Sequence, residues 1–246
     1  MDPLEEIKRL LPSCSEAGKR EILSLLRKEF PIHGLEVDWN VAAEVVLEAI
    51  NRAEDMTQRM FRGVLAEAAC KVEVIDKLEG WLEVTESGGH PYDFKIERDG
   101  RAVTIQAKLQ RKQDGKPLSA DRAQGLWNPA QYVVETQKSR AGKNAAGENT
   151  RPYRFGEFDI LAVSMEPITR NWSTFRFTLG KWLIPRKENP AWLAIYQPVS
   201  FAPDDDWTDS LATCIEWLDR GGQKTIQGAE SAEHPKPKRS RGKTAE

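Results

Sequence analysis

Residues 92–108 read YDFKIERDGRAVTIQAK, in which two runs of alternating apolar and polar residues flank Asp99-Gly100. An Asp-Gly pair between two such runs is a strong β-hairpin signal, because both residues accept the positive φ that a two-residue turn requires. With Asp99 and Gly100 in the turn, Arg98 faces Arg101, and the pairing continues outward one residue at a time.

This register sorts the hairpin residues onto two faces. One face is apolar and consists of the facing pairs Phe94 with Ile105 and Ile96 with Val103. On the other face Asp93 lies opposite Gln106, and Lys108 follows two residues later on the same side of its strand. The pattern therefore predicts that Asp93, Gln106 and Lys108 converge.

These three residue types suit the hydrolysis of a phosphodiester bond. The reaction requires neutralisation of charge at the phosphate and activation of water, both of which a carboxylate-held Mg²⁺ promotes. Asp93 is the expected anionic ligand, with the Gln106 amide oxygen and the Ala107 main-chain carbonyl as further metal ligands. The Lys108 ammonium would stabilise negative charge or position the attacking water. The competing interpretation is an exposed hairpin with incidental polar residues.

The residues resemble the PD-(D/E)xK nuclease superfamily, in which an Asp begins one strand and (D/E)xK lies on the next. Here the corresponding residues are Pro91-Tyr92-Asp93 and Gln106-Ala107-Lys108. Tyr92 separates the proline from the aspartate, and Gln106 replaces the usual acid, as in the QxK branch that includes Mrr-like enzymes. The resemblance covers residues 60 to 112, and the topology extends it to about residue 185. It implies an α/β fold with a restriction endonuclease-like core, a central mixed β-sheet flanked by helices, and Mg²⁺ as cofactor.

The superfamily often places a glutamate on the helix before this hairpin, and Glu67 is the matching position, as a catalytic residue and metal ligand. It borders the apolar face of an amphipathic helix that also carries Met56 and Met60. The alternative for Glu67 is a surface glutamate at the helix edge. Glu86, at the end of the preceding strand, is a second candidate.

The length and composition of the chain limit the classes of protein in which these motifs can lie. With 246 residues, 39% of them apolar and 30% charged, the chain is long enough for one substantial core with a helical appendage. It lacks the roughly 20 consecutive apolar residues of a membrane span, so we expect a cytoplasmic protein without membrane contact. The three scattered cysteines and three scattered histidines favour neither disulfides nor a zinc site.

Periodicity divides the chain into an N-terminal helical region (1–55), a nuclease core with a C-terminal elaboration (56–220) and a disordered basic tail (221–246). A long amphipathic helix, capped by Asp38 and broken near Asp55, leads into the core. The other expected elements are strands at 81–86, 94–97, 102–109, 158–163, 174–179 and 182–184, a helix at 119–137 interrupted by Pro129, and a helix capped by Thr208 that stops at Gly221-Gly222.

Basic residues gather after the hairpin. Between Arg98 and Arg154 there are twelve Lys or Arg against five Asp or Glu, a balance of about +7 within a chain whose net charge is −2. A solvated surface is the ordinary interpretation, but beside a nuclease motif the excess favours DNA phosphates. The candidate DNA-binding residues are Arg111, Lys112, Lys116, Arg122, Lys138, Arg140, Lys143, Arg151 and Arg154.

Several nucleases share this chemistry. Because the sequence has no obvious ATPase, methyltransferase or reader domain, a self-contained type II restriction endonuclease that cuts a specific double-stranded DNA sequence fits best. A palindromic site implies a homodimer, and a cognate DNA methyltransferase acting on the same site is a further expected partner. The alternatives are a modification-dependent defence nuclease, a Holliday junction resolvase and a catalytically inactive DNA-binding module.

Overall fold

The computed structural model describes residues 2–30, 34–86, 88–125, 127–138 and 151–226. The chain divides into two compact units, Met1–Phe61 and Arg62–Glu246, and the boundary falls within helix α5 (Asp55–Glu73). None of the helices among the described residues combines the length and the apolar character needed to cross a membrane.

The first unit is helical. After α1 (Pro3–Leu10) and a 3₁₀ turn, η1 (Leu11–Ser13), it contains α2 (Glu16–Glu29), α3 (Gly34–Asp38), α4 (Ala43–Arg52) and the start of α5. Side-chain caps begin the first two helices, because Asp2 accepts from the Leu4 N–H and Ser15 accepts from the Gly18 N–H. The break that the sequence predicts near Asp55 is confirmed, whereas Asp38 ends α3 and caps no helix.

A mixed five-stranded sheet forms the centre of the second unit. Its strands lie in the order β1-β2-β3-β7-β8, and only the β3–β7 pair is parallel. The strands are β1 (Leu82–Glu83), β2 (Phe94–Arg98), β3 (Arg101–Leu109), β7 (Ile160–Ser164) and β8 (Phe175–Leu179). Every residue of β7 and β8 is buried, as expected for strands covered on both faces.

The hairpin register predicted from the sequence is confirmed. Phe94 pairs with Ile105, Ile96 with Val103, and Arg98 with Arg101. Asp99 and Gly100 have φ values of 53° and 77°, as a type I′ turn requires.

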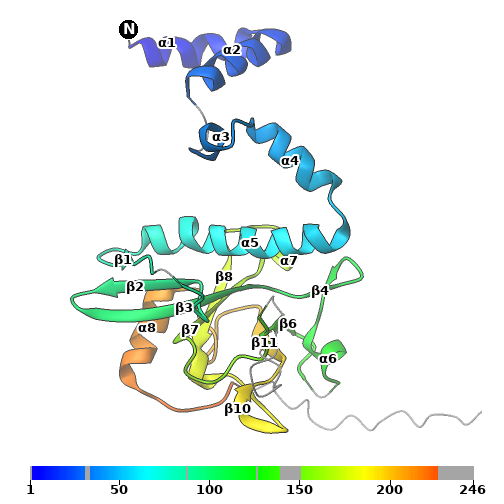
Figure 1. The fold of residues 1–246 in the computed structure, drawn as a ribbon, viewed down its shortest axis with the longest axis vertical. Coiled ribbons are helices and arrows are strands. Elements are labelled where there is room, and N and C mark those ends of the chain that lie inside the picture. The colour runs from blue at the N-terminus through cyan, green and yellow to red at the C-terminus, as the bar shows by residue number, and fades with distance from the viewer. Residues whose placement is uncertain (1, 31–33, 87, 126, 139–150, 227–246) are drawn as a thin grey trace, which may run out of the picture. The chain divides into compact units, whose positions relative to one another are not determined.

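Helices flank the sheet on both sides. The C-terminal turns of α5 lie over one face and α8 (Leu211–Arg220) lies over the other (Figure 1). Cys70 of α5 and Cys214 of α8 are fully buried in the same core cluster as the sheet residues. The predicted fold class, a central mixed sheet flanked by helices after a helical N-terminal region, is confirmed. The cap of α8 is Ser210 and not Thr208, while its end at Gly221 is as predicted.

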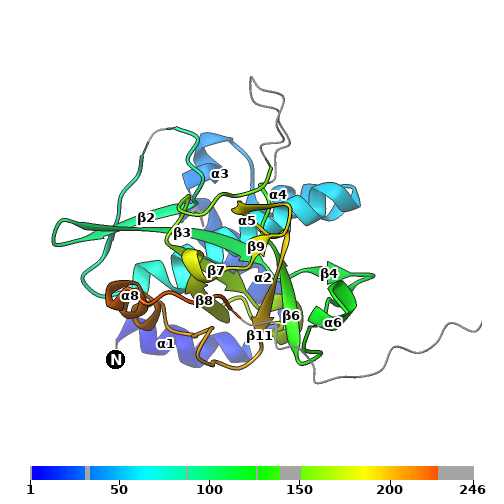
Figure 2. The same ribbon diagram turned by 90° about the horizontal axis from the view of Figure 1, so that it is seen from below.

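The helix predicted at residues 119–137 is wrong. Only α6 (Ala120–Ala123) is helical there, and β6 (Gln131–Glu135) follows. The physical reason is tertiary pairing, because β6 forms five antiparallel pairs with β11 (Tyr196–Ser200) (Figure 2). The β-branched Val133 and Val134 are fully buried in this pairing, which outweighs the helical pattern.

Short elements complete the unit. They are η2 (Ile75–Lys77), β4 (Lys112–Gln113), β5 (Lys116–Pro117), α7 (Glu166–Thr169), η3 (Gly180–Trp182), β9 (Pro185–Arg186) and β10 (Asn189–Leu193). The strand predicted at 182–184 is replaced by η3 and β9. The described chain continues to Ile226, whose buried side chain joins the core six residues beyond the predicted end of the elaboration; residues 227–246 lie outside the described residues.

One close backbone approach in this core is testable. A Cβ atom at Gly180 would lie 2.5 Å from the Phe158 carbonyl oxygen, whereas a Cβ atom at Gly222 would meet nothing within 4 Å. We therefore expect Gly180→Ala to lower the free energy of unfolding by about 1–3 kcal/mol in urea denaturation. Gly222→Ala should change it by less than about 0.5 kcal/mol. Equal stability of the two variants would contradict this packing.

Candidate active site

The hairpin places three of the predicted site residues together. Asp93 directly precedes β2, and its N–H donates to the Ile105 carbonyl at 3.0 Å. Gln106 and Lys108 lie two residues apart on β3, in register with Leu161 and Val163 of the parallel strand β7. Because β3 is an inner strand, Gln106 is only 1% exposed.

The Asp93 carboxylate is fixed through one of its two oxygens. Asp93 Oδ2 accepts from the Ala107 main-chain N–H at 2.9 Å and from Nε2 of Gln106. Asp93 Oδ1 has no hydrogen-bond partner among the described residues. Loss of water around the carboxylate on burial raises the pKa of Asp93, while the Lys108 charge and the Ala107 N–H oppose this rise. Oδ2 thus holds the carboxylate in place, and Oδ1 stays without a hydrogen bond from the described residues.

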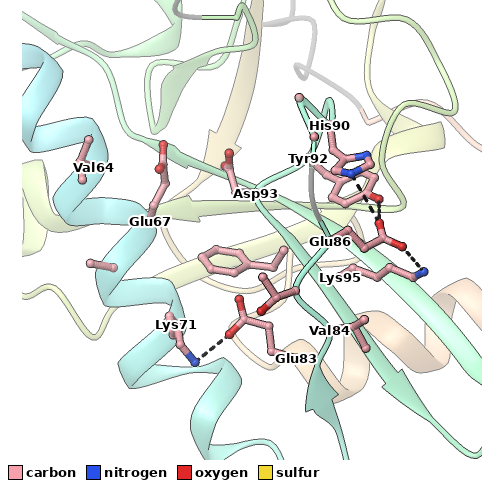
Figure 3. A pocket seen from close by; sticks show the side chains of 15 residues that line it. Val64, Glu67, Lys71, Glu83, Val84, Glu86, His90, Tyr92, Asp93 and Lys95 are labelled. Carbon is pink, nitrogen blue, oxygen red and sulfur yellow. Dashed lines mark hydrogen bonds and ion pairs between the residues drawn. The ribbon is translucent and has the colours of Figure 1, made fainter.

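Glu67 brings a second carboxylate from α5. Its side chain points to the same space as that of Asp93 (Figure 3). It is partly buried and forms no hydrogen bond or ion pair with the residues that the structure describes. Burial and then repulsion by Asp93 raise the pKa of Glu67 to about 7, and the Lys108 charge acts in the opposite direction.

The Lys108 ammonium is also without a hydrogen-bond partner in the described part of the chain. Burial lowers its pKa, against the attraction of Asp93, Glu67 and Glu135. Its Nζ lies 5.4 Å from the ring centroid of Tyr153, within the range of a cation–π contact. An ammonium that is not neutralised by a direct ion pair keeps its charge available to a ligand.

Tyr153 is a member of the site that the sequence did not indicate. Its hydroxyl donates to Oε1 of Gln106 at 3.0 Å, and its side chain is only 4% exposed. The Gln106 amide oxygen, which the sequence predicts to be a metal ligand, is therefore turned toward Tyr153. Its nitrogen faces Asp93 and also donates to the Ala107 carbonyl at 3.1 Å.

A cleft of about 490 Å³ opens beside Glu67 and Asp93. Glu86 also lines it, but its carboxylate is held by the Lys95 Nζ at 2.7 Å and by the Tyr92 hydroxyl (Figure 3). Glu67, and not Glu86, is therefore the carboxylate placed beside Asp93.

The predicted DNA-binding residues have diverse surroundings. Arg111 pairs with Glu135, and Lys138 pairs with Glu157 at 2.8 Å. The Arg151 Nε donates to the Lys138 carbonyl at 3.4 Å, and the Arg154 guanidinium lies over Trp192. Lys112 and Lys116 belong to the small β4–β5 hairpin, Arg122 is exposed on α6, and Arg140 and Lys143 lie outside the described residues. Their contacts with DNA stay a prediction.

The donor set fits a hard divalent cation. Glu67 and Asp93 supply carboxylate oxygens, Ala107 supplies a carbonyl oxygen, and none of the donors contains sulfur or imidazole nitrogen. Among the described residues, no group of three or more His, Cys, Asp or Glu could hold a metal ion. Two carboxylates with carbonyl oxygens, water and phosphate are nevertheless the usual surroundings of protein-bound Mg²⁺.

Comparisons with known proteins add little to this geometry. No protein-family model matches the chain, and no curated protein matches it. Among solved structures, the chain is similar to a bacterial homing endonuclease, with a TM-score of 0.38 and 15% sequence identity over 66% of this chain and 94% of that chain. At this identity and TM-score, the likeness assigns neither a family nor an activity to the chain.

The raised pKa of Glu67 predicts a pH-dependent stability. Its pKa of about 7 in the folded protein exceeds the ordinary value of 4.5, so the ionised carboxylate destabilises the fold as the pH rises through this interval. In chelator, Glu67→Gln should therefore raise the free energy of unfolding at about pH 8 and leave it nearly unchanged at about pH 4.5, as measured by urea denaturation.

Glu86→Gln is the matched control for this measurement. Hydrogen bonds from Lys95 and then Tyr92 lower the pKa of Glu86, so its charged form stabilises the fold. This variant should be less stable than the wild type above about pH 4.5, the opposite sign to Glu67→Gln. If Glu67→Gln changes the free energy of unfolding by the same amount at every pH, the pKa of Glu67 is not raised in the folded protein.

Proposed function

We propose that this chain is a Mg²⁺-dependent DNA endonuclease, and more specifically a type II restriction enzyme that hydrolyses phosphodiester bonds of double-stranded DNA. The observation that carries the proposal is that Asp93 and Glu67 meet at one cleft, with the Lys108 ammonium near enough to interact with both charges. The Glu67 carboxylate and the Lys108 ammonium form no hydrogen bonds with described residues. Such a set can bind a cation and an anionic phosphate side by side.

The residues that would hold Mg²⁺ are Asp93 and Glu67, with the Ala107 carbonyl and the Gln106 amide oxygen as neutral ligands. When bound, Mg²⁺ supplies charge neutralisation at the phosphate and lowers the pKa of water. The cation would also relieve the repulsion between the Glu67 and Asp93 carboxylates, which raises the pKa of Glu67. Binding near neutral pH should accordingly release a proton from Glu67.

Lys108 would act on the phosphate. Its ammonium is attracted by Asp93 and Glu67, yet none of the carboxylates that the structure describes forms a direct ion pair with it. A DNA phosphate bound beside Asp93 would receive a hydrogen bond from the Lys108 Nζ, and this bond would stabilise the negative charge that develops during hydrolysis. Burial lowers the pKa of Lys108, so the same Nζ is also suited to position the attacking water.

The proposal of a restriction enzyme, among the possible nucleases, rests on the domain organisation of the chain more than on its candidate active site. The chain pairs one α/β unit with a helical N-terminal unit, and this is larger than a minimal junction resolvase needs. A palindromic duplex would be cut by a homodimer, each subunit attacking one strand. A cognate methyltransferase of the same specificity would protect the host DNA. A monomer mass in the cleaving complex would contradict the dimer.

We expect Asp93→Asn and Lys108→Ala each to lower the rate of DNA cleavage by at least about 100-fold, because each removes a charge that acts at the scissile phosphate. The measurement is fragment sizing of long double-stranded DNA with Mg²⁺ or with chelator. Glu86→Gln and Lys95→Ala are matched controls that line the same cleft but pair with each other, and they should retain cleavage.

The choice of DNA separates the candidate functions. Discrete fragments from unmodified DNA, formed only with Mg²⁺, are the expected result. Cleavage confined to methylated DNA or to four-way junctions would replace the type II assignment with a modification-dependent nuclease or a resolvase. DNA that is bound but left intact in every form would contradict the nuclease proposal and identify a binding module.

A further inference from the structure

The Gln106 amide is held from both ends. Its nitrogen lies between two oxygens, Asp93 Oδ2 and the Ala107 carbonyl, and its oxygen accepts the Tyr153 hydroxyl proton at 3.0 Å. A primary amide has one donor end and one acceptor end. The opposite orientation would set the amide oxygen against a carboxylate oxygen and a carbonyl oxygen, so the cation-free site favours the observed one.

This orientation conflicts with a bound cation. The Gln106 nitrogen donates to the Ala107 carbonyl oxygen, which is one of the proposed cation ligands, and to the Asp93 carboxylate, which is another. Its N–H bonds would therefore point toward an ion that these two groups bind. Rotation of the amide by half a turn about its last side-chain torsion, which has a broad two-fold profile, replaces the nitrogen with the oxygen. The amide nitrogen then faces Tyr153.

The Tyr153 hydroxyl suits both orientations. A phenolic hydroxyl can donate to an amide oxygen and can also accept from an amide nitrogen. Its ring is fixed by an edge-to-face contact with Phe158 at 5.4 Å between centroids, and by Lys108 and Lys138, whose Nζ atoms lie 5.4 and 5.1 Å from the ring centroid. The hydroxyl can therefore form a hydrogen bond with the amide in either orientation, and the ring does not have to move.

We propose that Tyr153 is a positioning residue for the cation site, whose hydroxyl is the hydrogen-bond partner of the Gln106 amide in both of its orientations, nitrogen or oxygen toward the site. This inference deepens the proposed nuclease function and rests on it. It also gives a physical reason for glutamine at a position where the nucleases that the sequence resembles usually carry an acid. A glutamate at 106 would add a further negative charge beside Asp93 and Glu67, whereas the glutamine nitrogen satisfies the Asp93 and Ala107 oxygens when no cation is bound.

The test is a Mg²⁺ titration of the full chain without DNA, followed by NMR of the Gln106 side-chain NH₂ group, which is assigned by its loss in Gln106→Glu. In the wild type, saturating Mg²⁺ should shift the NH₂ resonances, because their acceptors change from the Asp93 and Ala107 oxygens to the Tyr153 hydroxyl. The Ala107 main-chain N–H reports independently on whether Asp93 binds the cation.

Tyr153→Phe keeps the ring and removes only the hydroxyl. It removes the hydrogen bond of the amide from both the cation-free and the cation-bound site, so Mg²⁺ affinity should change by less than about threefold. The Gln106 NH₂ resonances of this variant should resemble the wild type without Mg²⁺ and differ from it in saturating Mg²⁺, where their acceptor is lost. Gln106→Glu should instead tighten Mg²⁺ binding and lower the melting temperature in chelator. Tyr132→Phe is the matched control, a partly buried tyrosine on β6, and should bind Mg²⁺ like the wild type.

Two negative results are distinguishable. A Mg²⁺-dependent shift at Ala107 with an unchanged Gln106 NH₂ signal, or with the same Mg²⁺-saturated NH₂ resonances in Tyr153→Phe as in the wild type, would overturn the role of Tyr153 and leave the cation site standing. No Mg²⁺ response at Ala107, Gln106 or Glu67 in the wild type would overturn the proposed function and this inference together.

Discussion

The hydrogen bond from the Ala107 main-chain N–H to Asp93 Oδ2 joins the residue before β2 to the middle of β3, and the candidate site depends on it. It exists because the Asp99-Gly100 turn fixes the register of the hairpin. A slip of one residue would move Gln106 and Lys108 to the opposite face of the sheet. The turn, although it lies at the far end of the hairpin, therefore decides which side chains meet.

The charges of the candidate site are not fully neutralised by ion pairs among the described residues. Two carboxylates, Glu67 and Asp93, lie near the Lys108 ammonium, and burial together with repulsion by Asp93 raises the pKa of Glu67 to about 7. By contrast, Glu86 nearby is paired with Lys95, and the buried Glu166 is paired with Arg62. The two carboxyl groups whose pKa is raised, Glu67 and Asp93, are thus the ones near Gln106 and Lys108 of β3. This is the pattern expected where binding of a ligand, and not the fold, supplies the missing charge.

The sequence predicted the parts of the site that depend on local pattern. The turn signal and alternation placed Asp93, Gln106 and Lys108 together. Glu67 was indicated by the resemblance to the PD-(D/E)xK nucleases, supported by its position at the edge of an apolar helix face. Tyr153 was missed because it lies 47 residues from its partner Gln106 and belongs to no periodic run. The strand β6 was mistaken for a helix for a related reason, since its partner β11 is distant in the sequence and only tertiary pairing decides its conformation.

The most direct test of a cation site at Asp93 and Glu67 is the anomalous scattering of Mn²⁺ in crystals of the full chain, since Mn²⁺ prefers the same oxygen ligands as Mg²⁺. One strong peak is expected within bonding distance of Asp93, Glu67 and the Ala107 carbonyl. The Gln106 amide oxygen would then face the ion. A site that stays empty while Mn²⁺ binds elsewhere, for instance at the acidic residues Asp204, Asp205 and Asp206, would contradict it.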